Sequence, residues 1–176
     1  MIQYAKEAEE AALLAAAQSM CAAARTAPKT KGQDYLVTAI LTGDDKEALA
    51  RKMEDLGERF DYGFFLRDAG NVRASQAVVV LGFKPHVSGL NGGCQYCGFR
   101  DCAECAEKGG RCVYGPIDLG IAIGSAVSVA SAARVDSRVM FSAGRAALEL
   151  GCLEGAVDVI GILLSVSGKS PYFDRK

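Results

Sequence analysis

The feature of this sequence most able to do chemistry is a dense run of cysteines. Five of the seven cysteines lie between residues 92 and 115, in the stretch GGCQYCGFRDCAECAEKGGRCVYG. They are Cys94, Cys97, Cys102, Cys105 and Cys112, separated by two, four, two and six residues. Cysteine thiolates are the usual ligands of structural zinc and of iron–sulfur clusters, so this density predicts a metal site.

Two kinds of metal centre compete for this spacing. Zinc ribbons usually separate two C-x2-C pairs by about a dozen residues or more, so that each pair approaches the ion from its own side. Only four residues separate the two pairs here. Iron–sulfur motifs pack three or four cysteines into about a dozen residues, because one loop wraps a cluster with several corners. The spacing favours a 4Fe-4S cluster, with zinc as the alternative.

A cluster with four corners leaves one of the five cysteines over, and the spacing alone leaves two ligand sets open. Both sets contain Cys94, Cys97 and Cys102. Cys105 as the fourth ligand gives the more compact set. Cys112 in its place allows the chain to close the site from the far side.

Two further groups of residues are candidates for function. Lys29 and Lys31 lie beside Gly32 in a loop, where two lysines and backbone amides can bind a phosphate, although such a loop is more often simply solvated. His86 is the only histidine, and a single loop histidine is expected to be solvated. Cys21, within an alanine-rich helix, is expected to be a small buried hydrophobic residue and not a ligand.

The elements that must position these residues follow from the hydrophobic pattern. Three apolar segments predict buried strands and four segments predict helices. The strands are residues 35–41, 77–81 and 157–165, and the helices are residues 4–25, 46–56, 116–133 and 145–150. An apparent capping box at Asp44 and Glu47 starts the second helix and Gly57 ends it. Residues 60–66 are ambiguous, and residues 135–144 are expected to connect two helices.

The helix after Pro116 is almost wholly apolar and small. Gly120, Gly124 and Ser128 are four residues apart, which predicts a buried helix that a neighbour approaches closely on that side. Its longest uncharged stretch, residues 119–133, is shorter than the roughly 20 residues of a membrane-spanning helix. The order of elements predicts an α+β or α/β layered domain over residues 1–176. The cysteine module, residues 89–115, is inserted before this helix and is expected to lie against the domain core.

Composition and charge exclude several classes. The chain has 20 basic and 21 acidic residues and no basic block, so nucleic acid is not an expected partner. Charged residues interrupt the first apolar run and no basic leader precedes it, which predicts a cytoplasmic protein without membrane association. In a reducing cytosol the cysteines are expected to bind metal and not to form disulfides.

Several segments resemble known families. CQYCGFRDC followed by Cys112 resembles the four-iron four-sulfur module C-x2-C-G-F/Y-x2-C of redox-complex B subunits and corrinoid iron–sulfur proteins. This resemblance implies the ligands Cys94, Cys97, Cys102 and Cys112, with Cys105 as the alternative. AAARTAPKTKGQDYL, GLNGGCQYCGF, PIDLGIAIGSAVSVASAARVDSRVMFSAG and SGKSPYFDRK together resemble the uncharacterised ferredoxin-domain-containing family of bacteria and archaea.

A more distant resemblance concerns the fold. A helix that ends in Ala27-Pro28 before a loop and a strand, followed by a late small-residue helix, is similar to the nitroreductase fold. Members of that fold are homodimers that hold flavin mononucleotide (FMN) at the interface. The similarity implies an FMN site near Lys29 and Lys31 and a likeness of the sheet to the nitroreductase sheet. The chain lacks the Arg-x-Ser-x-Arg segment with which those enzymes grip the flavin phosphate.

These patterns predict an iron–sulfur redox protein that passes electrons to or from a flavin or small acceptor on a homodimeric, nitroreductase-like scaffold. The alternative is a zinc-stapled or cluster-bearing binding or sensor module without catalysis. Residues for substrate chemistry cannot be selected, because the sequence shows no nucleophile with an evident base, no phosphate loop and no paired carboxylates. Substrate and electron donor stay open.

Overall fold

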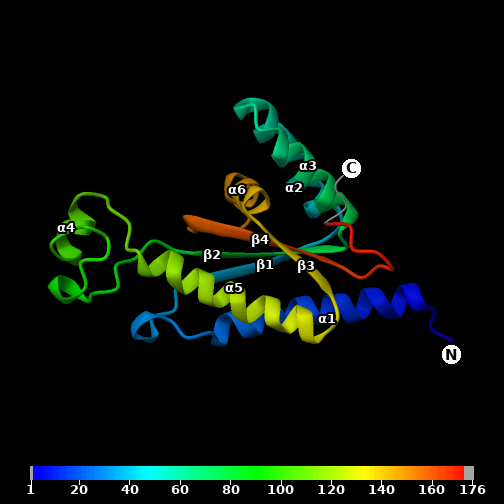
Figure 1. Ribbon diagram of the computed structural model, residues 1–176, viewed down its shortest axis with the longest axis horizontal. Helices are drawn as coiled ribbons and strands as arrows, with labels where there is room; N and C mark the ends of the chain where they lie inside the picture. Colours follow the sequence, from blue (N-terminus) through cyan, green and yellow to red (C-terminus); the bar gives the residue numbers. More distant parts are fainter. Residues whose placement is uncertain (1, 173–176) are drawn as a thin grey trace.

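A four-stranded antiparallel sheet lies between two layers of helices (Figure 1). The structure is a computed structural model and describes residues 2–172. The strand order is β1-β2-β4-β3, and each neighbouring pair is antiparallel. The strands are β1 (Leu36–Leu41), β2 (Ala77–Phe83), β3 (Asp136–Met140) and β4 (Asp158–Ser165). Every residue of β2 is buried, as expected of a valine-rich strand covered on both faces.

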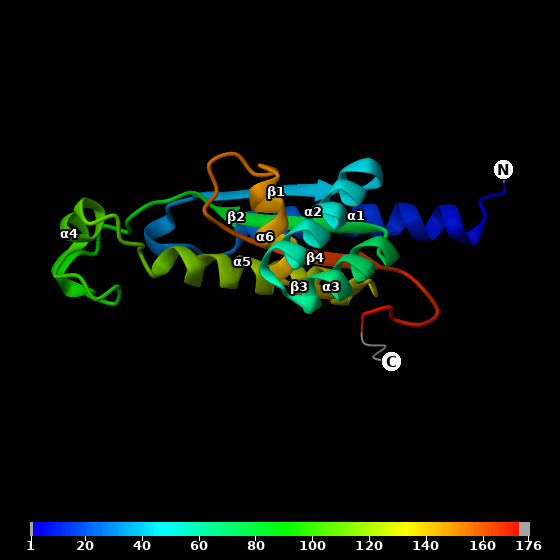
Figure 2. The same cartoon turned by 90° about the horizontal axis from the view of Figure 1, so that it is seen from above.

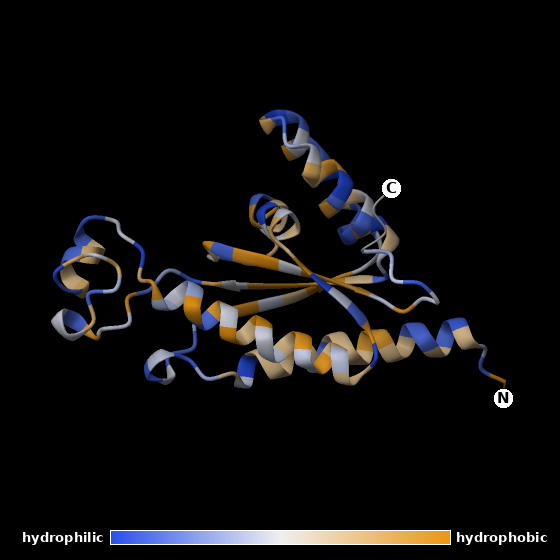
Figure 3. Ribbon diagram, viewed as in Figure 1, coloured by the Kyte–Doolittle hydropathy of each residue, from blue (hydrophilic) through white to orange (hydrophobic). Residues whose placement is uncertain are grey.

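Each face of the sheet has its own hydrophobic core. The helices α1 (Ala5–Thr26) and α5 (Tyr114–Ala132) cover one face. The other face is covered by α2 (Gly43–Phe60), α3 (Gly63–Ala74) and α6 (Phe141–Glu149). Figures 1 and 2 show these two layers, with α1 extending past the sheet at its N-terminal end. Figure 3 shows the hydrophilic residues of α1 gathered at that protruding end. The predicted layered class with mixed helices and strands is confirmed.

Glycines set how closely α6 lies on the sheet. A Cβ atom built on Gly144 would overlap the carbonyl oxygen of Val159 in β4. A Cβ atom on Gly161 would lie 2.7 Å from the Cβ atom of Ala143. Because no real side chain tolerates such approaches, glycine at these two positions allows helix and strand to pack backbone to backbone.

The predicted bounds of the second helix are wrong at both ends. The N-cap of α2 is Thr42 and its side chain makes no capping hydrogen bond, so the expected capping box at Asp44 does not form. Gly57 lies inside α2, where a Cβ atom would come within 3.1 Å of the Phe65 side chain of α3. This glycine admits a close neighbour and does not end the helix. The helix ends instead at Phe60, and its C-cap residue Asp61 has φ 55° and ψ 44°.

Two segments for which the sequence predicted no helix or strand contain regular secondary structure. The ambiguous residues 60–66 end α2 and begin α3. The expected connection at residues 135–144 contains the edge strand β3 and the start of α6, which begins at Phe141 and not at Arg145. An edge strand pairs on one side only, and β3 pairs with β4 alone. Its sequence DSRVM therefore carries only a weak hydrophobic signal.

The face of α5 that was expected to be buried is the exposed one. Gly120, Gly124 and Ser128 are exposed, and no atom would lie within 4 Å of a Cβ added to either glycine. The opposite face packs on α1 and the sheet through small side chains such as Ala122 and Ala126. By length and composition α5 could cross a membrane, but a single helix of this kind is weak evidence, because core helices of soluble proteins have the same properties.

The cysteine module connects β2 to α5 and lies beyond the end of the sheet (Figures 1 and 2). It contains the short 3₁₀ turn η2 (Asn91–Gly93) and the helix α4 (Cys102–Glu107). The expectation that the module is held against the domain core is therefore wrong. The module projects from one end of the molecule, beyond the N-terminus of α5.

Candidate metal centre

Four cysteines of the module line one small cavity. They are Cys94, Cys97, Cys102 and Cys112, and all four are partly exposed. Cys105 does not line this cavity and is only 1% exposed. The structure thus brings together the four residues that the resemblance to 4Fe-4S modules implies as ligands. All seven cysteines are free thiols.

Local interactions of the loop place the first three cysteines. Asp101 caps α4 by accepting a hydrogen bond from the Glu104 N–H at 2.9 Å, which puts Cys102 in the first turn of that helix. The Glu104 carboxylate in turn accepts the Arg100 N–H at 2.7 Å. Gly98, directly after Cys97, has φ +81°, a conformation that favours glycine. These contacts bend the chain around the cavity.

The sulfur of Cys112 lies at the N-terminus of α5 and has several hydrogen-bond donors. Partial burial alone would raise the pKa of this thiol. The N–H and hydroxyl of Ser88 and the N–H groups of Tyr114 and Gly115 outweigh burial and lower the pKa. The Asn91 N–H also donates to the Cys102 sulfur at 3.3 Å. The donors around Cys112 therefore favour its thiolate, which is the metal-binding form.

Cys105 is in a different environment. Burial is the main cause that raises the pKa of its thiol. A hydrogen bond to Cys97 and the electrostatic effect of the neighbouring Cys112 and Cys102 raise it further. A buried thiol with a raised pKa stays protonated and acts as packing material. The choice between Cys105 and Cys112 as fourth ligand is still a prediction, and these surroundings favour Cys112.

The cysteines of the module are not arranged as a site for a single metal ion. Among residues 2–172, no group of three or more histidine, cysteine, aspartate or glutamate side chains is arranged to hold a metal ion. A single zinc ion needs four sulfurs at about 2.3 Å from one centre. A 4Fe-4S cluster has four separate corners, so its ligands surround a larger volume. Four thiols around one cavity suit the donor set of such a cluster.

The structure gives the predicted phosphate-binding lysines other partners. The Lys29 ammonium group is almost fully buried and donates to the carbonyl oxygens of Ala24, Arg25 and Ala27 at 3.3, 2.6 and 2.9 Å. It thus caps the C-terminal end of α1, where a cation suits the helix dipole. Lys31 is exposed, has φ 56°, and lies 3.4 Å from the Gly89 carbonyl oxygen. A cofactor-binding role for either residue is still a prediction.

One buried carboxylate that the sequence analysis missed anchors this lysine loop. Asp118 of α5 is 2% exposed and accepts two hydrogen bonds from Thr30, one from its N–H and one from its hydroxyl, each at 3.0 Å. Its position near the N-terminal end of α5 suits the helix dipole but identifies no partner. The partner lies 88 residues away in the sequence, so local pattern could not identify it.

The two remaining candidates are packed residues. The ring of His86 stacks on Tyr35 with centroids 4.1 Å apart and an angle of 10°, so the histidine is more ordered than a solvated loop residue. Cys21 is partly buried against the core below α1, and burial raises the pKa of its thiol. It lies on the long helix, outside the cysteine module.

A protein of Archaeoglobus fulgidus, itself described as uncharacterized, is 41% identical to this chain over 184 residues, which is 99% of this chain and 98% of the relative. Residues 108–175 match the family described as "Uncharacterized protein containing a ferredoxin domain (DUF2148)". This chain belongs to that ferredoxin-domain family. The matched segment of the ferredoxin-domain protein includes Cys112, α5 and the second half of the sheet, and the other four cysteines of the module precede it.

Solved structures show the fold of this ferredoxin-domain protein. A nitroreductase with bound FMN from Desulfitobacterium hafniense superposes with a TM-score of 0.59 and 16% identity, covering 96% of this chain and 81% of that one. A second nitroreductase with bound FMN, from Bacteroides fragilis, gives 0.60 and 11%, covering 92% and 81%. A BluB-like flavoprotein from Clostridium difficile gives 0.54 and 17%, covering 92% and 84%. The sheet and its flanking helices have the nitroreductase fold, as predicted.

Proposed function

We propose that this chain is an iron–sulfur redox protein in which Cys94, Cys97, Cys102 and Cys112 bind a 4Fe-4S cluster. The observation that carries the proposal is that these four thiols, and not Cys105, line one cavity. Membership of a ferredoxin-domain family and a fold shared with flavin-dependent oxidoreductases support a redox role. When bound, such a cluster supplies one-electron transfer.

The protein's own contribution is to hold the thiolates and to set the reduction potential of the cluster through hydrogen bonds. Hydrogen bonds from backbone amides to cluster sulfurs are one of the ways in which proteins set a reduction potential. Ser88, Tyr114 and Gly115 provide such donors at Cys112, and Asn91 provides one at Cys102. The position of the module at the end of the molecule leaves it accessible to an electron donor or acceptor.

Flavin binding has less support from the residues of one chain. The nitroreductases from Desulfitobacterium hafniense and Bacteroides fragilis bind FMN, which suggests the same cofactor here. However, Lys29 is occupied by three carbonyl oxygens, and Arg145, beside an apolar cavity between α5 and α6, is paired with Glu149 at 2.6 Å. These residues do not form a phosphate site for a flavin.

A homodimer is the second part of the proposal. Ile117 and Ile121 on α5 are 40% and 41% exposed and continue the exposed face of Gly120 and Gly124. Such a flat apolar helix face suits close contact with a second copy of the chain. Light scattering should give twice the mass of the 18.5 kDa chain, and Ile121→Glu should give the monomer mass. A monomer for the unchanged protein at every concentration would refute this assembly.

The alternative function is a metal-stapled recognition module without redox activity. The observation in its favour is the projection of the module beyond the sheet, with Tyr96 70% exposed at its surface. Zinc would suit this role because its structural sites are closed and do not change oxidation state.

Two single substitutions test the ligand set against a matched control. Cys112→Ser and Cys105→Ser make the same chemical change in the same module. If Cys112 is a ligand, Cys112→Ser should lose most of the iron of anaerobically purified protein, while Cys105→Ser should retain it. Iron lost from Cys105→Ser and kept by Cys112→Ser would establish the compact set instead. No iron in the unchanged protein would refute the redox proposal itself.

A further inference from the structure

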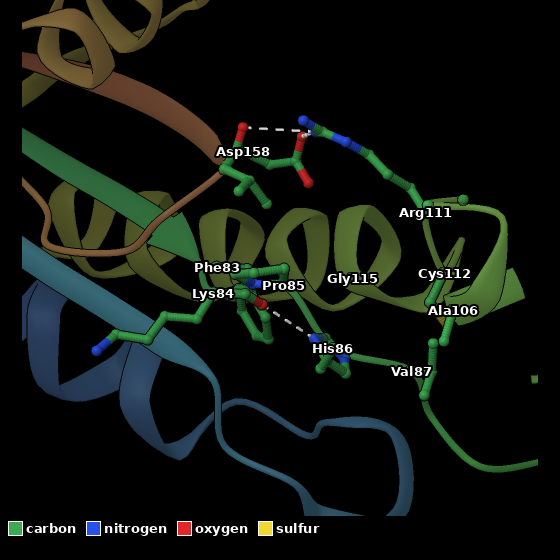
Figure 4. Close-up of a pocket in the computed structure, with 13 residues that line it drawn as sticks. Phe83, Lys84, Pro85, His86, Val87, Ala106, Arg111, Cys112, Gly115 and Asp158 are labelled. Atoms are coloured by element: carbon green, nitrogen blue, oxygen red, sulfur yellow. Dashed lines mark hydrogen bonds and ion pairs between the residues drawn. The ribbon is translucent and has the colours of Figure 1, made fainter. Parts of the chain in front are cut away.

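A second cavity, of about 440 Å³, lies between the end of the sheet and the cysteine module. Its volume falls within the range of about 300–1,000 Å³ that small-molecule sites occupy. The walls come from three parts of the chain: residues 83–87 after β2, residues 106–115 of the module, and residues 157–158 at the start of β4. Figure 4 shows these segments around the cavity. No role assigned above uses this space.

One candidate metal ligand separates this cavity from the cysteine-lined one. Cys112 lines both. A molecule in the larger cavity would therefore lie in contact with a residue that holds the proposed cluster. Because electron transfer is fastest over short distances, a redox partner bound here would need no further approach to the module.

Most of the cavity wall is apolar and suits a flat ring. Phe83, Pro85, Val87 and Val157 line it, together with glycines of the module. Only glycine fits at position 110, because a Cβ atom there would lie 2.3 Å from a Phe99 ring carbon. A small aromatic molecule would exclude water from this surface on binding.

Arg111 provides a positive group with unused donors. Its Nη1 atom donates to the Val157 carbonyl oxygen at 3.5 Å and to the Asp158 carboxylate. A guanidinium group has five N–H donors in a planar fork, so its Nε and Nη2 donors can bind a carboxylate in addition. The ion pair with Asp158 also holds Arg111 in place and offsets the charges of both residues, so a ligand carboxylate would be recognised by the open N–H donors and not by net charge.

His86 provides a second, differently directed polar group. Its Nδ1 atom lies 3.1 Å from the Lys84 carbonyl oxygen, and since a carbonyl only accepts, Nδ1 carries the hydrogen. In the neutral ring Nε2 is then an acceptor. The ring is fixed by stacking on Tyr35 and by contact with Phe83, whose centroid is 5.8 Å away. In Figure 4 His86 lies across the cavity from Arg111 and Asp158.

We propose that this cavity binds a planar aromatic carboxylate, with the carboxylate at Arg111, the ring against the apolar wall and a hydroxyl or N–H group donating to Nε2 of His86. This inference rests on the proposed function in one respect. If the cluster is bound through Cys112, a molecule in this cavity lies beside it and would be its small redox acceptor. Binding itself can be measured without turnover.

Three redox-inert probes test the proposal by calorimetry on the full, anaerobically purified chain: 6-hydroxy-2-naphthoate, 2-naphthoate and 2-naphthamide. We expect the hydroxynaphthoate to bind saturably, one per chain. Loss of the carboxylate in the amide should weaken binding about tenfold or more, the effect of one charge-assisted hydrogen bond. Equal binding of naphthoate and naphthamide, or no saturable binding of any probe, would overturn the proposal.

Matched variants locate the site. Arg111→Gln should weaken the naphthoates about tenfold, whereas Arg100→Gln, the same change on the module surface outside the cavity, should not. His86→Phe keeps the stacked ring and should abolish the advantage of the hydroxylated probe. Unchanged affinities in both Arg111→Gln and His86→Phe would place the probe elsewhere. Iron and sulfide are measured on the same samples, so a missing cluster refutes the proposed function while missing binding refutes this inference.

Discussion

The hydrogen bonds between Asp118 and Thr30 give a prediction with a calculable size. Asp118→Ala removes two hydrogen bonds to a carboxylate that is 2% exposed. Hydrogen bonds to charged groups contribute about 1.5–3 kcal/mol each to stability, and the partly buried position of Thr30 favours the lower figure. We therefore expect the free energy of unfolding to fall by about 3 kcal/mol. For a chain of this size that lowers Tm by about 6–12 °C.

A double-mutant cycle assigns this loss to the contact. Thr30→Val removes the hydroxyl but keeps the N–H bond to Asp118, and should cost about 1 kcal/mol. In urea unfolding at matched metal content, the double variant should lose less than the sum of the single variants, by about 1 kcal/mol. Additive losses, or a loss below about 1 kcal/mol for Asp118→Ala, would show that this contact does not anchor the lysine loop.

Three other substitutions test the packing of the domain. Gly144→Ala should destabilise the fold by about 1–3 kcal/mol because its Cβ atom meets the β4 backbone. The same change at Gly70, on the exposed side of α3 with open space around it, should stabilise the fold by about 0.5–1 kcal/mol. Chemical unfolding measures both, and equal effects would contradict the close packing of α6. Burial raises the pKa of Tyr172 to about 12, above the unfolded value of about 10. Its contribution to stability is therefore complete below about pH 10 and is lost between about pH 10 and 12. Tyr172→Phe should flatten the fall of unfolding free energy in that window, and parallel pH profiles for the two proteins would refute this.

The sequence could predict the elements whose residues carry a strong local pattern. The alanine-rich α1 and the continuous apolar runs of β2 and β4 were expected close to their observed positions. The strand β3 was missed because its pairing with β4, and not its own composition, makes it a strand. Gly57 was misjudged for a similar reason, since the residue it accommodates belongs to another helix.

The candidate site also contains features that the sequence could predict and features that depend on contacts in space. The cysteine spacing predicted a metal site and left Cys105 and Cys112 open as the fourth ligand. The resemblance to known modules implied the set with Cys112, and the structure places those four thiols around one cavity. The partners of Lys29 and Asp118 could not be predicted, because they depend on how a helix end and a loop meet in space. The position of the module beyond the sheet likewise depends on the length and direction of the chain on either side of it.

The central claim is that the cysteine module binds a 4Fe-4S cluster. Iron, acid-labile sulfide and zinc should be quantified on one anaerobically purified sample, together with its visible spectrum before and after dithionite. We expect a brown protein with about four iron and four sulfide per chain and a broad absorption that dithionite bleaches. A colourless protein with about one zinc per chain, or with no metal, would contradict it.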